Sequence, residues 1–429
     1  MHSSSLLIVG FAALAAAKPA AQGIDFASIN AIVLPTITGP HPTATKESIV
    51  IDNAAASASG SAKATGLATA SATASQNVKR TYGGWGGNGG WGGNGGWGGN
   101  GGWSNGGGSG GGSGEAASTS CTTTQSTPTS TTAQNSVPTS STAAVPETTP
   151  DVSKACAIQP DGYGPKVQPD TVDAFLAYTQ FHTDAKNAAT PSGYTQSFVD
   201  LNAAVTAVTY LGLTTFTTYD VAQCGSLCDS TSLCTGFNIY VERDPYMNPS
   251  DACKNPASIT NYKCTLWGSG VSAESATNTG QMRTDFQVVI TGSNGYSKTV
   301  TPAPQPGWQP PQQCGGGNKG HSHPNTCLGQ AFFPGPYNPA VCAGYATAQN
   351  SKNLSLISWW MQMIYKFLNY SPFQCKFFNS YMLKKNGKPI GTYCSLFAQS
   401  YSSNQATYNP GQQGSDSWTC ESSYTYTLN

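Results

Sequence analysis

The pattern of apolar and polar positions after residue 150 predicts small sheets that are each paired with a short helix. Residues 234–241 alternate apolar Phe237, Ile239 and Val241 with polar positions, which is typical of a half-buried strand. A helix is expected to begin near Asp220, a suitable N-cap, just before this strand. The local order is therefore helix followed by strand.

Similar patterns predict the neighbouring elements. Residues 171–186 have the apolar spacing of an amphipathic helix, and residues 198–218 are rich in Val, Thr and Tyr, which favour strands. Further strands are expected at residues 264–267 and 286–290. Residues 354–367 predict a helix whose apolar face is broad enough to pack on the rest of its module.

A set of landmarks occurs twice in the same order. The first copy reads Tyr219-Asp-Val-Ala-Gln-Cys224, Cys234-Thr-Gly-Phe-Asn-Ile-Tyr240, Cys264-Thr-Leu-Trp267 and Ala276-Thr-Asn-Thr-Gly-Gln281. The second copy reads Tyr337-Asn-Pro-Ala-Val-Cys342, Cys375-Lys-Phe-Phe-Asn-Ser-Tyr381, Cys394-Ser-Leu-Phe397 and Ala406-Thr-Tyr-Asn-Pro-Gly-Gln412. Since chance rarely repeats so many landmarks in order, we expect two homologous modules in tandem.

The cysteine and aromatic spacing of these copies resembles the PAN/apple module. This resemblance implies an α+β fold in which a curved antiparallel sheet cradles one helix, held by helix-to-strand disulfides. It further implies three pairings: Cys224 with Cys264, Cys228 with Cys234, and Cys342 with Cys394. The second copy departs from the pattern, because Ala346 replaces the counterpart of Cys228 and a long insertion precedes Cys375. The residues alone leave the connectivity open.

Composition bears on the compartment and on the partners. The chain has 429 residues, no net charge and only 9% charged residues, so it shows no overall electrostatic preference for nucleic acid or anionic lipid. Its thirteen cysteines divide into six in each module region and Cys121, which is either a free thiol or an intermolecular bridge. Even sets of cysteines in small modules favour disulfides and an oxidising compartment.

The chain is expected to be exported. Residues 1–17 form a signal peptide, with an apolar run followed by small residues at the cleavage site. No other stretch is long and apolar enough for a membrane span, so we expect a secreted, extracellular or cell-wall protein.

The remaining boundaries follow composition. Residues 18–80 lack a convincing core pattern and end in Lys79-Arg80, a dibasic pair that favours a removed propeptide, although it would also suit an exposed charge pair. The segments that follow are a Gly/Trp repeat (81–114), a Ser/Thr/Pro-rich stalk (115–150), module 1 (151–299), a Pro-rich linker (300–313) and module 2 (314–429).

The Gly/Trp repeat carries evenly spaced indole rings at Trp85, Trp91, Trp97 and Trp103. Rings at this spacing could stack on sugar faces or associate with one another. A spacer that grew by repeat expansion is the competing interpretation. Burial of one indole ring per six residues cannot offset the conformational entropy that so many glycines would lose on folding, so we expect no packed core in this repeat.

The densest charge cluster of either module is Glu242-Arg243-Asp244, at the end of the predicted strand. It is interpreted either as a binding edge or as a local salt-bridge cluster. His321 and His323 lie two residues apart, but the partners that a zinc site would need are better used in disulfides. No recognisable catalytic motif occurs, so neither an enzyme nor a cofactor or metal is expected.

Aromatic residues near loops are candidates for recognition. They are Tyr246, Tyr262, Trp267, Trp308 and Tyr337, with Trp267 also placed for a core role and Tyr246 the strongest for binding. Asn353 and Asn369 are acceptors for N-glycosylation.

We expect a secreted glycoprotein that binds carbohydrate or an extracellular protein through disulfide-stapled modules, in adhesion or host interaction. One alternative is a structural wall component that acts through its Gly/Trp segment. Another is a polysaccharide-active hydrolase or esterase that uses Glu242 or Asp244. The sequence predicts neither the oligomeric state nor the ligand.

Overall fold

The structure is a computed structural model that describes residues 24–42, 44–65, 77–81, 151–368, 371 and 373–429. It is an α+β fold whose sheets are built from antiparallel strand pairs, and four disulfides staple it. The α+β class expected from the sequence is thus confirmed. The expected pairing of the module cysteines in disulfides is confirmed only in part, with four bridges among the described residues. None of the helices in the described part is both long and apolar enough to cross a membrane.

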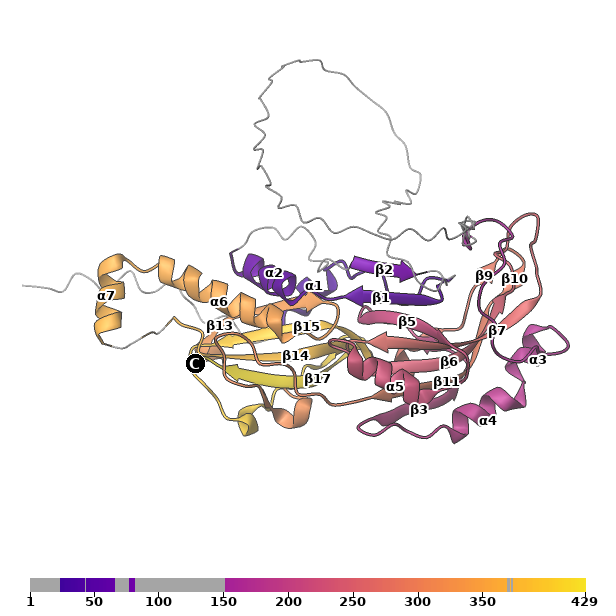
Figure 1. Ribbon diagram of the computed structural model, residues 1–429. Coiled ribbons are helices and arrows are strands. Elements are labelled where there is room, and N and C mark those ends of the chain that lie inside the picture. Colours follow the sequence, from indigo (N-terminus) through magenta and orange to yellow (C-terminus); the bar gives the residue numbers. More distant parts are fainter. Residues whose placement is uncertain (1–23, 43, 66–76, 82–150, 369–370, 372) are drawn as a thin grey trace, which may run out of the picture. The chain divides into compact units, whose positions relative to one another are not determined.

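The larger sheet has seven strands in the order β2-β1-β5-β7-β6-β11-β3 (Figure 1). Their bounds are β1 (Lys46–Val50), β2 (Asn77–Thr81), β3 (Thr195–Leu201), β5 (Tyr210–Phe216), β6 (Gly236–Pro245), β7 (Ser258–Trp267) and β11 (Val289–Ser297). Two short pairs accompany this sheet, formed by β4 (Ala204–Val205) with β8 (Ala276–Asn278) and by β9 (Met282–Arg283) with β10 (Phe286–Gln287).

Three helices pack their buried side chains on the larger sheet. They are α3 (Val172–Leu176), α4 (Thr179–Asn187) and α5 (Val221–Ser230). The single helix expected over residues 171–186 is therefore wrong, because the chain turns between α3 and α4 so that Phe175 and Phe181 both enter the core. Helix α5 begins as expected, since the Asp220 carboxylate accepts a hydrogen bond from the Gln223 amide.

The second sheet has the order β12-β17-β14-β15-β13, and β16 pairs with β17. Its strands are β12 (Gln312–Gln313), β13 (Cys327–Pro334), β14 (Phe377–Lys385), β15 (Lys388–Phe397), β16 (Gly411–Gln413) and β17 (Asp416–Thr427). Helix α6 (Pro339–Ser355) packs on this sheet through its N-terminal half, where Cys342 and Ala346 are fully buried.

Disulfides tie helices to strands in both sheets. Cys224 of α5 bonds to Cys264 of β7, and Cys342 of α6 bonds to Cys394 of β15. The other two bridges are Cys228–Cys234 and Cys156–Cys253. Three of these four are the pairs that the PAN/apple resemblance implies.

The second sheet nevertheless contains fewer disulfides than its six cysteines suggest. Cys314, Cys375 and Cys420 are buried and form no disulfide with any described residue. Burial raises the pKa of Cys314 to about 11 and those of Cys375 and Cys420 to about 12, so these thiols stay protonated. Cys121 lies outside the described residues.

The two sheets place similar residues at equivalent positions. Asn238 of β6 lies opposite Thr265, and Asn379 of β14 lies opposite Ser395. In each case the opposing residue comes directly after the disulfide-bonded cysteine, Cys264 or Cys394. Both asparagine side chains are fully buried. Each donates to a serine hydroxyl and to the following carbonyl on the next strand: Asn238 to Ser293 and Asn294, and Asn379 to Ser423 and Tyr424.

The described part of the segment before residue 82 belongs to these cores, contrary to the expectation that it lacks a core pattern. Strand β1 pairs with β5 at the edge of the larger sheet, and the buried Glu47 carboxylate accepts a hydrogen bond from the Tyr210 hydroxyl at 2.8 Å. Ile24 and Ile29, around α1 (Phe26–Asn30), are buried in the second sheet's core. Isolated apolar residues among Ala and Ser show no periodic pattern, so the sequence did not predict that these residues are buried.

Helix α2 (Asn53–Thr65) lies along α6 at very short range (Figure 1). A Cβ atom added at Gly60 would lie 2.0 Å from the Val341 carbonyl oxygen, and one at Gly344 would lie 2.0 Å from the Ser57 carbonyl oxygen. The absence of side chains at Gly60 and Gly344 is therefore what allows the two helices to touch.

The helix expected over residues 354–367 is also different. Helix α6 ends at Ser355, and a separate helix, α7 (Trp359–Phe367), follows a short turn. None of the residues of α7 is buried, so the expected packing on the module is wrong.

Candidate functional site

Two places in the structure could carry function: the charge cluster at the end of β6 and a cleft between α6 and α7. In the charge cluster, Lys263 of β7 lies between two carboxylates of the neighbouring strand. Its Nζ atom donates to the Glu242 carboxylate and lies 2.9 Å from Asp244 Oδ2. All three side chains are at most 7% exposed. Strand alternation puts Glu242 and Asp244 on one face, where register places Lys263.

Arg243 points to the opposite face and makes a separate set of contacts. Its guanidinium lies 2.7 Å from Asp170 Oδ1, donates to the Gln287 carbonyl oxygen at 2.9 Å and stacks over the Phe286 ring. The triplet 242–244 is therefore divided between two buried ion-pair networks, and its charged groups do not form an exposed edge.

The protonation of the cluster follows from its burial. Burial and the neighbouring Asp244 raise the pKa of Glu242 to about 8. Burial also opposes ionisation of Asp244, but Lys263 and Asn261 outweigh it and hold the pKa of Asp244 below its usual range. The neutral-pH state is thus a protonated Glu242 beside an Asp244–Lys263 ion pair, which leaves no net charge buried.

A small void adjoins this cluster. Asp161, Asp244 and Asn261 line it, and one side-chain oxygen of each has no hydrogen-bond partner among the described residues. Its volume of about 20 Å³ holds roughly one water molecule. Because a sugar ring cannot enter such a space, Glu242 and Asp244 cannot reach a polysaccharide in this structure.

Stability is expected to depend on pH through Asp161. Burial raises its pKa from 3.8 to about 6, so the folded state binds this proton more tightly than the unfolded chain does. The contribution to stability is present below about pH 4 and is lost as the pH rises through about 6. Asp161→Asn removes this dependence. The difference in the free energy of unfolding between variant and parent should therefore shift in favour of the variant by about 1–2 kcal/mol from acidic to neutral pH, after allowance for solvent screening.

Denaturant unfolding of both proteins across this pH range provides the measurement. Comparing the two proteins cancels the opposite effect of His321, whose pKa burial lowers to about 4. Parallel stability curves for parent and variant would contradict the assignment of this pH dependence to Asp161.

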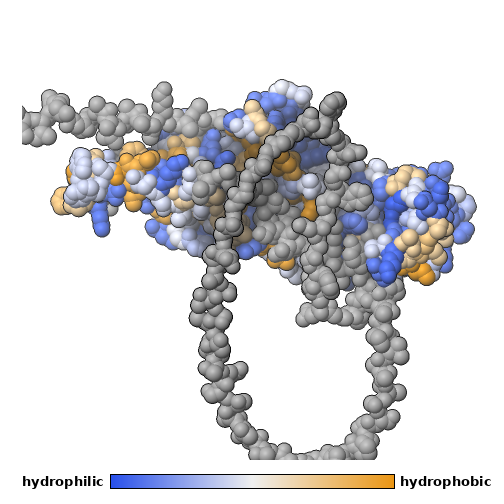
Figure 2. All heavy atoms as spheres, turned by 90° about the horizontal axis from the view of Figure 1, so that it is seen from above, coloured by the Kyte–Doolittle hydropathy of each residue, from blue (hydrophilic) through white to orange (hydrophobic). Residues whose placement is uncertain are grey.

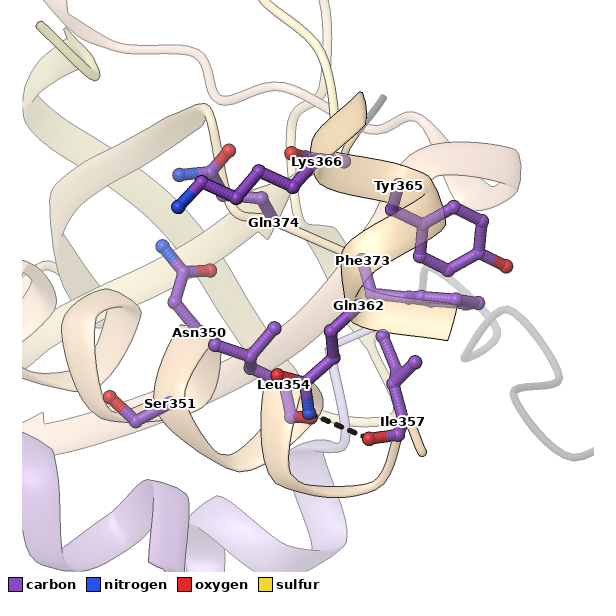
Figure 3. Close-up of a pocket in the computed structure, with 10 residues that line it drawn as sticks. Asn350, Ser351, Leu354, Ile357, Gln362, Tyr365, Lys366, Phe373 and Gln374 are labelled. Carbon is purple, nitrogen blue, oxygen red and sulfur yellow. Dashed lines mark hydrogen bonds between the residues drawn. The ribbon is translucent and has the colours of Figure 1, made fainter. Parts of the chain in front are cut away.

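The second place is a cleft of about 470 Å³ between the C-terminal half of α6 and helix α7. Figure 3 shows that the Lys366 ammonium points toward the amides of Gln374 and Asn350 on one side. Ile357, Tyr365 and Phe373 gather on the other side. The remaining lining residues are Ser351, Leu354, Gln362 and Ser371. The cleft thus has a polar end and an apolar, aromatic end.

Hydrogen bonds hold the walls of this cleft in place. The Asn350 side chain accepts from the Cys375 amide and donates to the Cys375 carbonyl oxygen, which ties α6 to the start of β14. Gln362 donates to the carbonyl oxygens of Leu354 and Ile357, which fixes α7 against the end of α6. Lys366 is exposed, so its charged group is available to a ligand.

The structure places the remaining candidates as follows. Tyr246 is 39% exposed, whereas Trp267, Trp308, Tyr337 and Tyr262 are buried, so the last four are not surface contacts. The Asn353 amide donates to the Phe373 carbonyl oxygen at 2.8 Å. Residues Trp85, Trp91, Trp97, Trp103 and Asn369 lie outside the described part.

The histidine pair is enclosed by aromatic rings. His321 is buried with its Nδ1 atom 3.0 Å from His323 Nε2, and His323 stacks on Tyr401. No group of three His, Cys, Asp or Glu residues among the described positions is arranged to hold a metal ion.

The sequence pattern found the helix that lines the cleft but not the cleft itself. The apolar residues of 354–367 predict a helix, whereas their exposure depends on the direction in which α7 leaves the end of α6. No protein-family model, curated protein or solved structure matches the chain.

Proposed function

We propose that this chain is a secreted carbohydrate-binding protein built from two PAN/apple-like modules, and that the cleft between α6 and α7 receives the sugar. The observation that carries the proposal is the lining of this cleft. Aromatic rings at one end offer faces on which sugar rings stack, and amides and an ammonium at the other end can hydrogen-bond to hydroxyl groups.

Support for two copies of one module comes from equivalent positions in the two sheets. Each sheet has a helix-to-strand disulfide and a buried asparagine one register position away from it. Each also contains a short 3₁₀ turn closed by a capping box, at Ala273–Ser275 and at Ser403–Gln405. A shared ancestral module accounts for these similarities together.

The cleft favours binding over hydrolysis. Cleavage of a glycosidic bond generally requires a pair of carboxyl groups, and none of the ten lining residues is Asp, Glu or His. The carboxylates of Glu242 and Asp244 are buried at a different place in the fold, against β7. This arrangement supports recognition as the role of the cleft.

Binding of the full secreted protein to chitin, β-glucan, mannan and a glycan array tests the proposal. Tyr365→Ala and Phe373→Ala are each expected to weaken binding about tenfold or more, because each removes a stacking surface of the cleft. Tyr246→Ala is the matched control, since this exposed tyrosine lies in the other module. Loss of binding only in the Tyr246 variant would move the site to module 1, and no glycan binding by the parent would overturn the proposal.

A further inference from the structure

The outer surface of α7 and of the turn before it is unusually apolar. Trp359 is 72% exposed and Phe367 is 89% exposed. Leu356, Trp360, Met363 and Leu368 are exposed beside them. Single exposed apolar residues need no explanation, but a contiguous group of large ones marks an interaction surface. We call these six residues the apolar tip.

The orientation of α7 is the reverse of that of an ordinary surface helix. Its polar Gln362 faces inward and is hydrogen-bonded to the end of α6, and Lys366 lines the cleft. The apolar side chains point outward instead. Figure 2 shows orange and tan surface, mixed with pale blue, on the side of the molecule where Figure 1 places α7. The fold therefore holds this helix so that its apolar side is presented to a partner.

The charges around the tip indicate what kind of partner fits. Residues 286–415 contain no Asp or Glu, although the whole chain has no net charge. Lys366 lies on α7 itself and is exposed, whereas the ammonium of Lys352 on α6 donates to the Ala64 carbonyl oxygen of α2. An apolar surface with Trp and Phe, with one exposed lysine on the same helix and no acidic residue in the surrounding stretch of sequence, is complementary to anionic lipid headgroups above an acyl layer. A protein partner would not require the complete absence of acidic residues.

We propose that the apolar tip inserts into the interfacial region of an anionic lipid bilayer and anchors the protein there peripherally. Helix α7 has nine residues and is about 13 Å long, so it lies in the interface and cannot cross a hydrocarbon core of about 30 Å. Trp359 and Trp360 occupy the headgroup boundary, where indole rings are favoured. On binding, the exposed side chain of Lys366 turns from the cleft toward the lipid phosphates, and its flexible stem keeps the charge in water.

Co-sedimentation of the full protein with vesicles tests this proposal. Vesicles of phosphatidylcholine mixed with phosphatidylglycerol are expected to bind the protein, and those of phosphatidylcholine alone to bind it at least about tenfold less. Trp359→Ser and Phe367→Ser should each weaken binding about tenfold, and added salt should weaken it further. Enzymatic removal of N-linked sugars beforehand excludes steric blocking by a glycan at Asn353 or Asn369.

Met282→Ser is the matched control, because Met282 is 61% exposed in the other module and should not affect binding. Equal loss in this variant, or no binding of the parent to anionic vesicles, would overturn the proposal. Sedimentation of the free protein adds a second criterion. A dimer that Phe367→Ser dissociates, without vesicle binding, would instead assign the tip to a contact between two copies. Glycan binding is measured in a separate assay. The proposal for the cleft and the proposal for the apolar tip can therefore each be contradicted without the other.

Discussion

Replacing Lys263 with Met is expected to lower the free energy of unfolding by about 3–5 kcal/mol. The lysine is the only cation that contacts both Glu242 and Asp244 among the described residues, and its side chain is 4% exposed. Without it, one face of the β6–β7 pair would bury carboxyl groups with no compensating charge. Denaturant unfolding under oxidising conditions measures the loss, with the four disulfides kept intact.

Lys186→Met provides the comparison, because Lys186 pairs with Asp200 while 62% of its side chain is exposed. Its loss should cost less than about 1 kcal/mol. Combining Lys263→Met with Glu242→Gln and Asp244→Asn should restore part of the stability. The Asp244 carboxylate, which needs the cation, is then replaced by a neutral amide, and Glu242 is held neutral at every pH. Similar losses for the two lysine variants would show that the buried cluster is no more important than a surface ion pair.

Cleavage after Arg80 is expected to leave the N-terminal fragment bound to the rest of the protein. Ile24, Ile29 and Ile49 are buried in the cores of the two sheets, and each contributes about 1.5–3 kcal/mol of apolar burial. Pairing of β1 with β5 adds backbone hydrogen bonds. Treatment with a protease specific for dibasic sites, followed by native and denaturing mass spectrometry, should show one complex under native conditions and two chains after denaturation.

Gly60→Leu tests which contact retains the fragment. A side chain at this position meets the backbone of α6, so the cleaved variant should lose its fragment under native conditions. Gly39→Leu is the control, because a Cβ atom there meets nothing within 4 Å. Release of the fragment from the cleaved parent protein would show that residues 24–80 form a conventional, dissociable propeptide. If the fragment stays bound in every variant, the packing of α2 on α6 does not determine retention.

The local elements of this protein could be predicted because each depends on neighbours in the sequence. Asp220 caps α5 through the backbone amide three residues later. The alternation at residues 234–241 predicted strand β6, but the expected half-buried pattern is wrong, because every position of β6 is buried. Three of the four disulfide pairs were implied by the PAN/apple resemblance, since a repeated spacing carries information that single positions lack. The fourth, Cys156–Cys253, was not.

The place of a residue in the cores was harder to predict. Trp308 and Tyr337 lie near proline-rich loops, yet both are buried because the loops fold back onto the second sheet. The segment before residue 82 looks featureless, and its small residues gain significance only where α2 meets α6.

The sequence by itself determined the α+β class, the start of α5 and the strand that follows this helix. It also supplied the reactive and apolar side chains whose positions matter. Only the tertiary structure decided where that chemistry lies. Glu242 and Asp244 meet Lys263 from another strand and are withdrawn from solvent, whereas the apolar residues of α7 remain outside. The physical reason is that burial depends on which distant segment covers a surface, and periodicity along the chain does not record that.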